Sequence, residues 1–168
     1  CCFKLESVDI PDTVESIENF AFCNCHSLQT INIPDTVKNI GISAFFICES
    51  LKSVKMPVEL QTLGSDAFSD CIELEKINIP KGLNKIESCT FKNCKKLKEV
   101  RLQEGIEEIG DEAFLSCEEL SLLELCNGIK KIGSKSFSNC IKLQSVDIPD
   151  TVEYIGYNAF YDCLSLHN

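Results

Sequence analysis

Hydrophobic residues recur along this chain at one fixed interval. Leucine occupies every twenty-third position from residue 5 onward without an insertion, as Leu5, Leu28, Leu51, Leu74, Leu97, Leu120, Leu143 and Leu166. A leucine-headed period of roughly 20 to 29 residues is typical of a solenoid. Each unit of a solenoid is too small to bury its own apolar side chains, so its neighbours complete the core. The spacing therefore predicts a repeat solenoid with a 23-residue period.

Three more apolar columns accompany the leucines, in the pattern L-x-x-V-x-I-P-x-x-V-x-x-I-G-x-x-A-F-x-x-C. They are Val8, Ile31, Val54, Ile77, Val100, Leu123 and Val146; Ile17, Ile40, Leu63, Ile86, Ile109, Ile132 and Ile155; and Phe22, Phe45, Phe68, Phe91, Phe114, Phe137 and Phe160. Because about seven copies share these columns, we expect one continuous core of stacked aliphatic and aromatic side chains.

The same pattern predicts the elements within each copy. L-x-x-V-x-I alternates between two faces and is rich in branched residues, which indicates a short strand. Copies of this strand are expected to pair as a parallel sheet on the concave face, and the proline that follows ends each strand. V-x-x-I-G favours an extended segment that turns at the glycine, and A-F-x-x-C allows no more than one helical turn. We therefore expect a right-handed arc with extended segments and short helical turns on the other faces.

The I-P, I-G and A-F-x-x-C signatures resemble the BspA-type leucine-rich repeat, the treponemal class. The match departs at Gln103 and Cys126, where the proline is missing, and at Thr90 and Ser136, where the alanine is missing. The resemblance implies one leucine-rich-repeat domain over residues 1–168. It also implies a cell-surface or secreted, adhesin-like protein that recognises host or matrix protein through the concave sheet. The class has no characteristic catalytic site.

Charge and motifs narrow the range of functions. The 168 residues carry a formal net charge of −10 at pH 7, which disfavours non-specific binding to nucleic acid or anionic membrane. No apolar run approaches the ~20 residues that cross a bilayer. No nucleophile elbow, phosphate-binding loop or zinc-protease motif occurs. We therefore expect no enzymatic activity, no catalytic residue and no cofactor.

Eight of the twelve cysteines form one column: Cys2, Cys25, Cys48, Cys71, Cys94, Cys117, Cys140 and Cys163. Disulfide bonds between stacked copies are one interpretation, because stacked Cα atoms lie within bonding distance. However, side chains in one column point the same way, which makes the required S–S dihedral of about 90° hard to reach. A buried thiol also packs as a small hydrophobe. The column therefore favours free, buried thiols.

Cys23, Cys25 and His26 resemble a metal cluster at first sight. Zinc sites usually need a C-x₂₋₄-C spacing and a second ligand pair, and the Cys23, Cys25 and His26 cluster by itself provides neither. If Cys25 faces the core, the other two side chains stand alone. We therefore predict no metal site.

Outward strand positions are free to vary, so they are where a partner is expected to bind. Positive charge gathers there in the middle copies, and the predicted binding patch consists of Lys52, Lys55, Lys76, Asn78, Lys98 and Arg101. Such a patch suits an acidic protein segment. The alternative is that alternating lysine and glutamate only keep the sheet soluble. A rival apolar patch consists of Ile42, Phe46, Ile47, Ile72, Leu115 and Ile141, and Tyr154, Tyr157 and Tyr161 cluster in the last copy.

Two further expectations concern the cellular compartment of the protein and the two ends of the chain. An intracellular scaffold for a cytosolic protein is the alternative to the surface protein, because many free thiols suit a reducing compartment. The chain begins at Cys1 and ends within a copy that Leu166 opens. Exposed terminal turns need a polar cap, so we expect an excerpt of a longer array that self-associates end to end.

Overall fold

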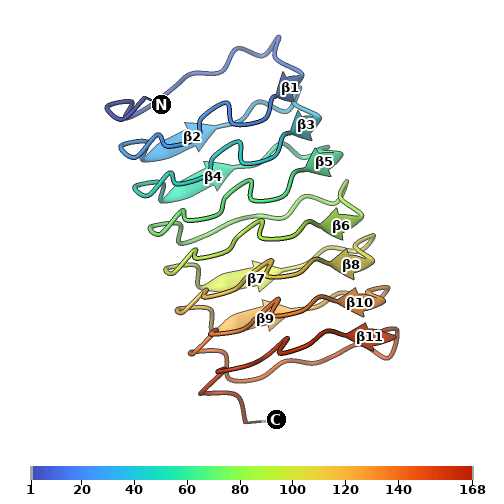
Figure 1. Cartoon of the computed structure of the whole chain (residues 1–168). Helices are drawn as coiled ribbons and strands as arrows, with labels where there is room; N and C mark the ends of the chain where they lie inside the picture. The colour runs from blue at the N-terminus through green and yellow to red at the C-terminus, as the bar shows by residue number, and fades with distance from the viewer. Residues whose placement is uncertain (1, 168) are drawn as a thin grey trace.

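The chain folds as one stack of near-identical turns. The computed structural model describes residues 2–167, and Figure 1 shows the turns following one another from the N-terminus to the C-terminus. Successive turns pair through parallel strands in a 23-residue register, as at Ile31 and Val54. The predicted parallel repeat solenoid is confirmed.

One side of the stack, called here the strand face, carries the L-x-x-V-x-I segments. Its strands are β2 (Thr30–Asn32), β4 (Ser53–Lys55), β7 (Glu99–Arg101) and β9 (Leu122–Glu124). β2 pairs with β4 and β7 with β9, and bridges from Lys76 to Ser53 and Glu99 join the two pairs. The middle residue of each strand points into the core while its neighbours point outward, as the alternation predicts.

Another side of the stack, called here the second face, carries the V-x-x-I-G segments (Figure 1). Its strands are β1 (Ser16–Ile17), β3 (Asn39–Ile40), β5 (Thr62–Leu63), β6 (Lys85–Ile86), β8 (Glu108–Ile109), β10 (Lys131–Ile132) and β11 (Tyr154–Ile155). They form two parallel sheets, β1-β3-β5 and β6-β8-β10-β11.

The A-F-x-x-C segments form hydrogen-bonded turns, and the expected helical turns are absent from residues 2–167. Cys48 N donates to Phe45 O, three residues back. Ser43 and Ile47 have φ angles of 53° and 57°. A right-handed helix cannot propagate through such residues, so the backbone turns repeatedly instead.

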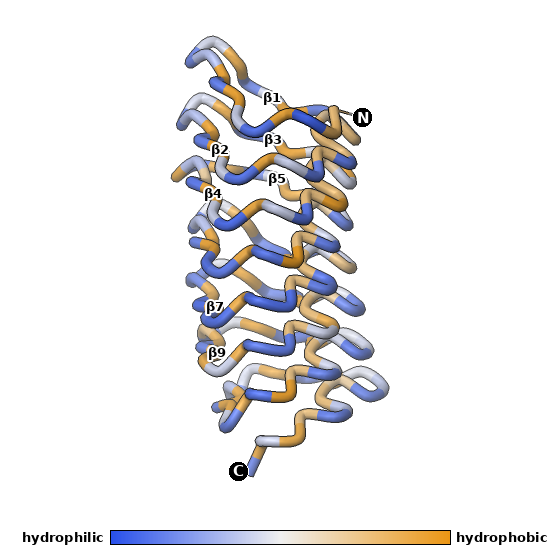
Figure 2. Tube along the Cα trace, turned by 90° about the vertical axis from the view of Figure 1, so that its left-hand side faces the viewer, coloured by the Kyte–Doolittle hydropathy of each residue, from blue (hydrophilic) through white to orange (hydrophobic). Residues whose placement is uncertain are grey.

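The phenylalanine column forms the centre of the core. Neighbouring rings stack at centroid distances of 5.0 to 5.7 Å, and the five inner rings are fully buried. Figure 2 shows hydrophobic and hydrophilic positions alternating along every turn. This continuity across copies is what lets short strands persist, because each is stabilised by its neighbours.

The cysteine column forms a second ladder beside the rings. From Cys48 to Cys163, each thiol of the column donates to the carbonyl of the phenylalanine 26 residues earlier; for example, Cys71 Sγ lies 3.3 Å from Phe45 O. Burial of the column is confirmed for its inner members, Cys25, Cys48, Cys71, Cys94, Cys117 and Cys140. Cys163 is half-buried and Cys2 exposed, and all the cysteines among residues 2–167 are free.

The glycine column has a role that the sequence did not reveal. A Cβ atom added at Gly64 would lie 2.5 Å from Ile42 N of the preceding turn. Glycine is therefore needed for close approach of two turns, and the φ of Gly64 is not positive. The chain does turn directly after Gly64, as predicted, but the close approach of the two turns is what requires glycine there.

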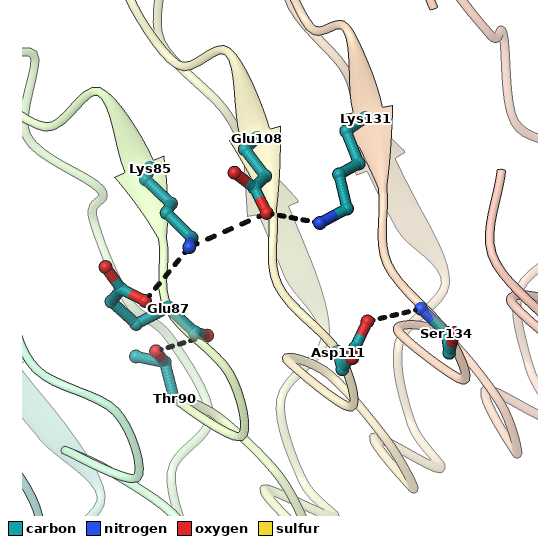
Figure 3. Close-up of polar contacts among 7 residues, drawn as sticks. All are labelled: Lys85, Glu87, Thr90, Glu108, Asp111, Lys131 and Ser134. Carbon is teal, nitrogen blue, oxygen red and sulfur yellow. Dashed lines mark hydrogen bonds and ion pairs between the residues drawn. The ribbon is translucent and has the colours of Figure 1, made fainter. Parts of the chain in front are cut away.

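Glu87 occupies the glycine position in the fourth copy. There β5 and β6 are not hydrogen-bonded to each other, and the rings of Phe68 and Phe91 have the largest separation in the stack, 5.7 Å. A depression of about 430 Å³ runs over this gap. In Figure 3 the Glu87 carboxylate points to Lys85, at 3.3 Å. We call this break between the third and fourth copies the seam.

Ser136 tests whether alanine, the usual residue of its column, is more stable there than serine. Its hydroxyl is buried without a hydrogen-bond partner among residues 2–167, in a column that elsewhere holds Ala113 and Ala159. An unsatisfied buried hydroxyl costs about 1–3 kcal/mol, so Ser136→Ala should raise the free energy of unfolding by about 1 kcal/mol. Urea denaturation measures this. Thr90→Ala is the control: its hydroxyl donates to Glu87 O at 2.8 Å, so stability should fall, and a Ser136→Ala variant that also loses stability contradicts the prediction.

Candidate binding surface

The six residues of the predicted patch share the strand face. Lys55 ends β4, Arg101 ends β7, and Lys76 forms the bridge between those strands. Lys52, Asn78 and Lys98 flank the same strand positions, and all six side chains are exposed. The alternation of each strand sends them outward because its middle residue fills the core.

Ion pairs divide the patch into two parts. Lys98 Nζ lies 2.8 Å from a Glu75 carboxylate oxygen. Arg101 Nε lies 3.1 Å from Glu124, and Glu99 is 3.7 Å from the same guanidinium. The hydrogen bond between Lys98 and Glu75 raises the pKa of the lysine and lowers the pKa of the glutamate. Lys98 and Arg101 are therefore already neutralised by internal carboxylates.

The remaining lysines of the patch are unpaired. Within residues 2–167, six of the sixteen basic residues form no ion pair: Lys4, Lys52, Lys55, Lys76, Lys81 and Lys135. Four of these six lie in two adjacent copies, on a chain of net charge −10. The positive potential is consequently concentrated between the third and fourth copies.

Lys81 belongs to this group but was not predicted, because it lies outside the strand columns. It follows Pro80 at the corner where the chain leaves the strand face. A signal was available, because the same position holds Asp12, Asp35 and Asp150 in other copies. A change of sign in one column marks a surface that differs from the rest of the array.

Two depressions lie beside these lysines. One, of about 280 Å³, opens on the strand face and is lined by Lys76, Asn78, Glu99 and Arg101. The other, of about 330 Å³, lies at the proline corner and also borders Asn78. The two depressions adjoin at that residue.

The second face contrasts with the strand face. Glu108 lies 3.5 Å from Lys85 and 2.8 Å from Lys131, on the two neighbouring strands (Figure 3). Lys130 pairs with Glu107 at 2.8 Å. These pairs lower the pKa of Glu108 and raise those of Lys130 and Lys131. The charged side chains on this face form ion pairs with one another between turns, so they are less available to bind a partner.

The rival apolar patch is less prominent than its composition suggests. Ile42 has 47% of its surface exposed, whereas the other members, Phe46, Ile47, Ile72, Leu115 and Ile141, are half-buried. The three tyrosines are exposed at the C-terminal end of the stack.

The geometry also bears on metal binding and on membrane insertion. Among residues 2–167, no group of three or more histidine, cysteine or acidic side chains could hold a metal ion. His26 instead contacts Glu49 at 3.0 Å. In the same part of the chain no helix is long and apolar enough to cross a membrane.

Comparisons with known proteins identify the family of this repeat. The family model described as BspA type Leucine rich repeat region (6 copies) matches residues 1–121 and 40–167. No curated protein matches the chain. A leucine-rich repeat protein from Bacteroides ovatus is 34% identical over 98% of this chain and 45% of its own, with a TM-score of 0.93. This chain therefore spans less than half of that relative.

Two further solved structures are similar. The leucine-rich repeat protein of T. pallidum is 30% identical over 97% of this chain and 78% of its own, with a TM-score of 0.91. A leucine rich cell surface protein from Faecalibacterium prausnitzii is 30% identical over 92% of this chain and 42% of its own, with a TM-score of 0.79. Leucine-rich repeat proteins are generally protein-interaction modules and typically non-enzymatic scaffolds. By its repeat, its fold and these matches, the chain belongs to the BspA-type leucine-rich repeat family.

Proposed function

We propose that this chain is a non-enzymatic module that binds a partner protein on its strand face, and that it acts as an adhesin-like protein at the cell surface or outside the cell. The observation that carries the proposal is the group of unpaired lysines, Lys52, Lys55 and Lys76, on an acidic chain. Because no internal carboxylate occupies them, a partner's acidic groups can bind there without first displacing an ion pair.

The surface location is supported by the relative from Faecalibacterium prausnitzii, which is a cell surface protein. An intracellular scaffold is the second candidate, favoured by the eleven free cysteines among residues 2–167, since thiols persist in reducing compartments.

Protease treatment of intact cells separates the two candidates. Loss of the protein from intact cells supports the surface location, and protection until lysis supports the scaffold.

The double reversal Lys55→Glu and Lys76→Glu tests the binding surface. Wild-type protein should bind at least one member of a panel of purified matrix and cell-surface proteins. The variant should bind that protein roughly tenfold more weakly, mainly through a slower association rate. Surface substitutions usually change stability by less than about 0.5 kcal/mol each, so the fold should persist. Biolayer interferometry at several salt concentrations measures both rate constants.

Lys4→Glu with Lys135→Glu is the matched control, because these two lysines are also unpaired within residues 2–167 but lie away from the middle copies. The control should bind like the wild type. If both double variants lose the same affinity, only the net charge matters and the strand face is not the contact surface.

A further inference from the structure

We propose that the strand face and the adjoining proline corner form one groove, which takes an extended acidic segment of the partner that carries an apolar anchor residue. This inference rests on the proposed function and deepens it by specifying the chemistry of the partner.

The groove follows from the two depressions that adjoin at Asn78. The strand-face depression is lined by Lys76 and Arg101, and the corner depression by Pro57, Pro80 and Lys81. A segment that follows both would run across the stack, in the direction of the turns. It would meet basic side chains on the strand face first and the corner afterwards.

The corner depression provides a site for an apolar side chain. Its floor includes Met56 and Ile79, which are 7% and 3% exposed, and Val58 beside them is 64% exposed. The column of Val58 otherwise holds only polar residues: Asp12, Asp35, Lys81, Glu104, Asn127 and Asp150. An exposed valine above an apolar floor has no role in the core and suits an apolar anchor of a ligand.

The unpaired lysines around the groove favour a ligand with acidic groups. Lys55, Lys76 and Lys81 are unpaired within residues 2–167. The acidic residues around the groove each have a partner: Asp35 accepts a hydrogen bond from Val58 N at 3.2 Å, and Glu99 lies 3.7 Å from Arg101. Glu59 pairs with Lys38 at 2.8 Å, and Glu75 pairs with Lys98 at 2.8 Å. The balance is therefore complementary to carboxylates.

Glu99 argues for a polypeptide over a uniform polyanion. Glu99 lines the strand-face depression beside Lys76, with its carboxylate 3.7 Å from Arg101, so a ligand with a negative charge at every step would place one charge against this carboxylate. A polypeptide can place acidic residues at the lysines, a neutral residue at Glu99 and an apolar residue at Val58. Nucleic acids and sulfated polysaccharides lack that apolar anchor.

Selection from a displayed library of random linear peptides tests the inference on the whole chain. Enriched peptides should contain acidic residues next to an aliphatic or aromatic residue. Lys76→Glu with Lys81→Glu should weaken their binding by about tenfold or more, and Val58→Asp by about tenfold. The Lys4→Glu, Lys135→Glu control should leave binding unchanged, and so should Ile42→Asp, which alters an exposed apolar residue elsewhere. Thermal unfolding verifies that each variant is folded.

Other results would overturn the inference in distinguishable ways. Equal binding of poly-glutamate and the selected peptides, or peptide binding that is insensitive to Val58→Asp, would reduce the groove to a general anion surface. If no peptide is enriched while a full-length protein still depends on Lys55 and Lys76, the inference fails and the proposed function stands. If neither peptide nor protein binding depends on these lysines, both fail.

Discussion

Replacement of Phe91 by alanine should lower the free energy of unfolding by about 3–5 kcal/mol. The ring is fully buried and stacks between Phe68 and Phe114 at centroid distances of 5.7 and 5.3 Å. Its backbone is held on the next turn, because Phe91 N donates to Ala113 O at 2.8 Å. The turns cannot close over the vacated space, so a cavity should remain. Chemical denaturation followed by circular dichroism measures the loss.

Phe160→Ala is the matched control within the same column. Phe160 is only half-buried, and among residues 2–167 its ring stacks on Phe137 alone, at 5.4 Å. We expect its loss to be about half of that for Phe91 or less, because less buried surface is removed. Equal losses in the two variants would contradict a core that depends on neighbours on both sides.

The inner cysteines should be nearly inert toward thiol reagents in the native protein. Burial raises the pKa of Cys48 to about 12 and those of Cys71 and Cys94 well above the ordinary 9.0. Since the thiolate is the reacting species, Cys48 should react roughly a thousandfold more slowly than an ordinary thiol even without steric protection. Cys2 is exposed and should react readily. Mass spectrometry after labelling of native and denatured protein locates each modified residue.

The same pKa shifts predict how stability changes with pH. The unfolded chain releases thiol protons above pH 9, whereas folded Cys48 retains its proton until about pH 12. The unfolded state therefore binds fewer protons in this window, and stability falls as pH rises from 9 toward 12. Below pH 9 the contribution of the buried thiols to stability is fully present.

Rapid labelling of native Cys71, or disulfide-linked peptides from the column, would contradict both predictions, because it would show that the thiols are not buried and free.

Periodicity was sufficient to predict the fold because the packing itself is periodic. The leucine, isoleucine and phenylalanine columns each repeat once per turn, so their burial follows from stacking alone. The cysteine column was predicted to be buried for its size, and the structure adds a polar reason. A thiol at that position donates to a phenylalanine carbonyl, as Cys94 does to Phe68 at 3.2 Å. Donor geometry of this kind depends on the backbone path and cannot be derived from spacing.

The exposed basic patch on the strand face was predictable only in part. Strand alternation correctly brought Lys55, Lys76 and Arg101 to one exposed face. It could not show that Arg101 is paired with Glu124, because long side chains choose partners across turns by local geometry. It also passed over Lys81, which lies at a corner outside the alternating pattern. Departures from a column were the more informative signal there, and Glu87 in the glycine column is another example.

The seam has a consequence for how the molecule comes apart. In a repeat array, cooperativity depends on coupling between adjacent units. On the second face, β5 of the third copy and β6 of the fourth copy are not hydrogen-bonded to each other, whereas all other successive strands are. Partial unfolding should therefore stop at this boundary and yield an N-terminal and a C-terminal block. Lys55 belongs to one block and Lys76 to the other. A ligand that contacts both would fasten the blocks together, so binding would make the whole array unfold as one unit.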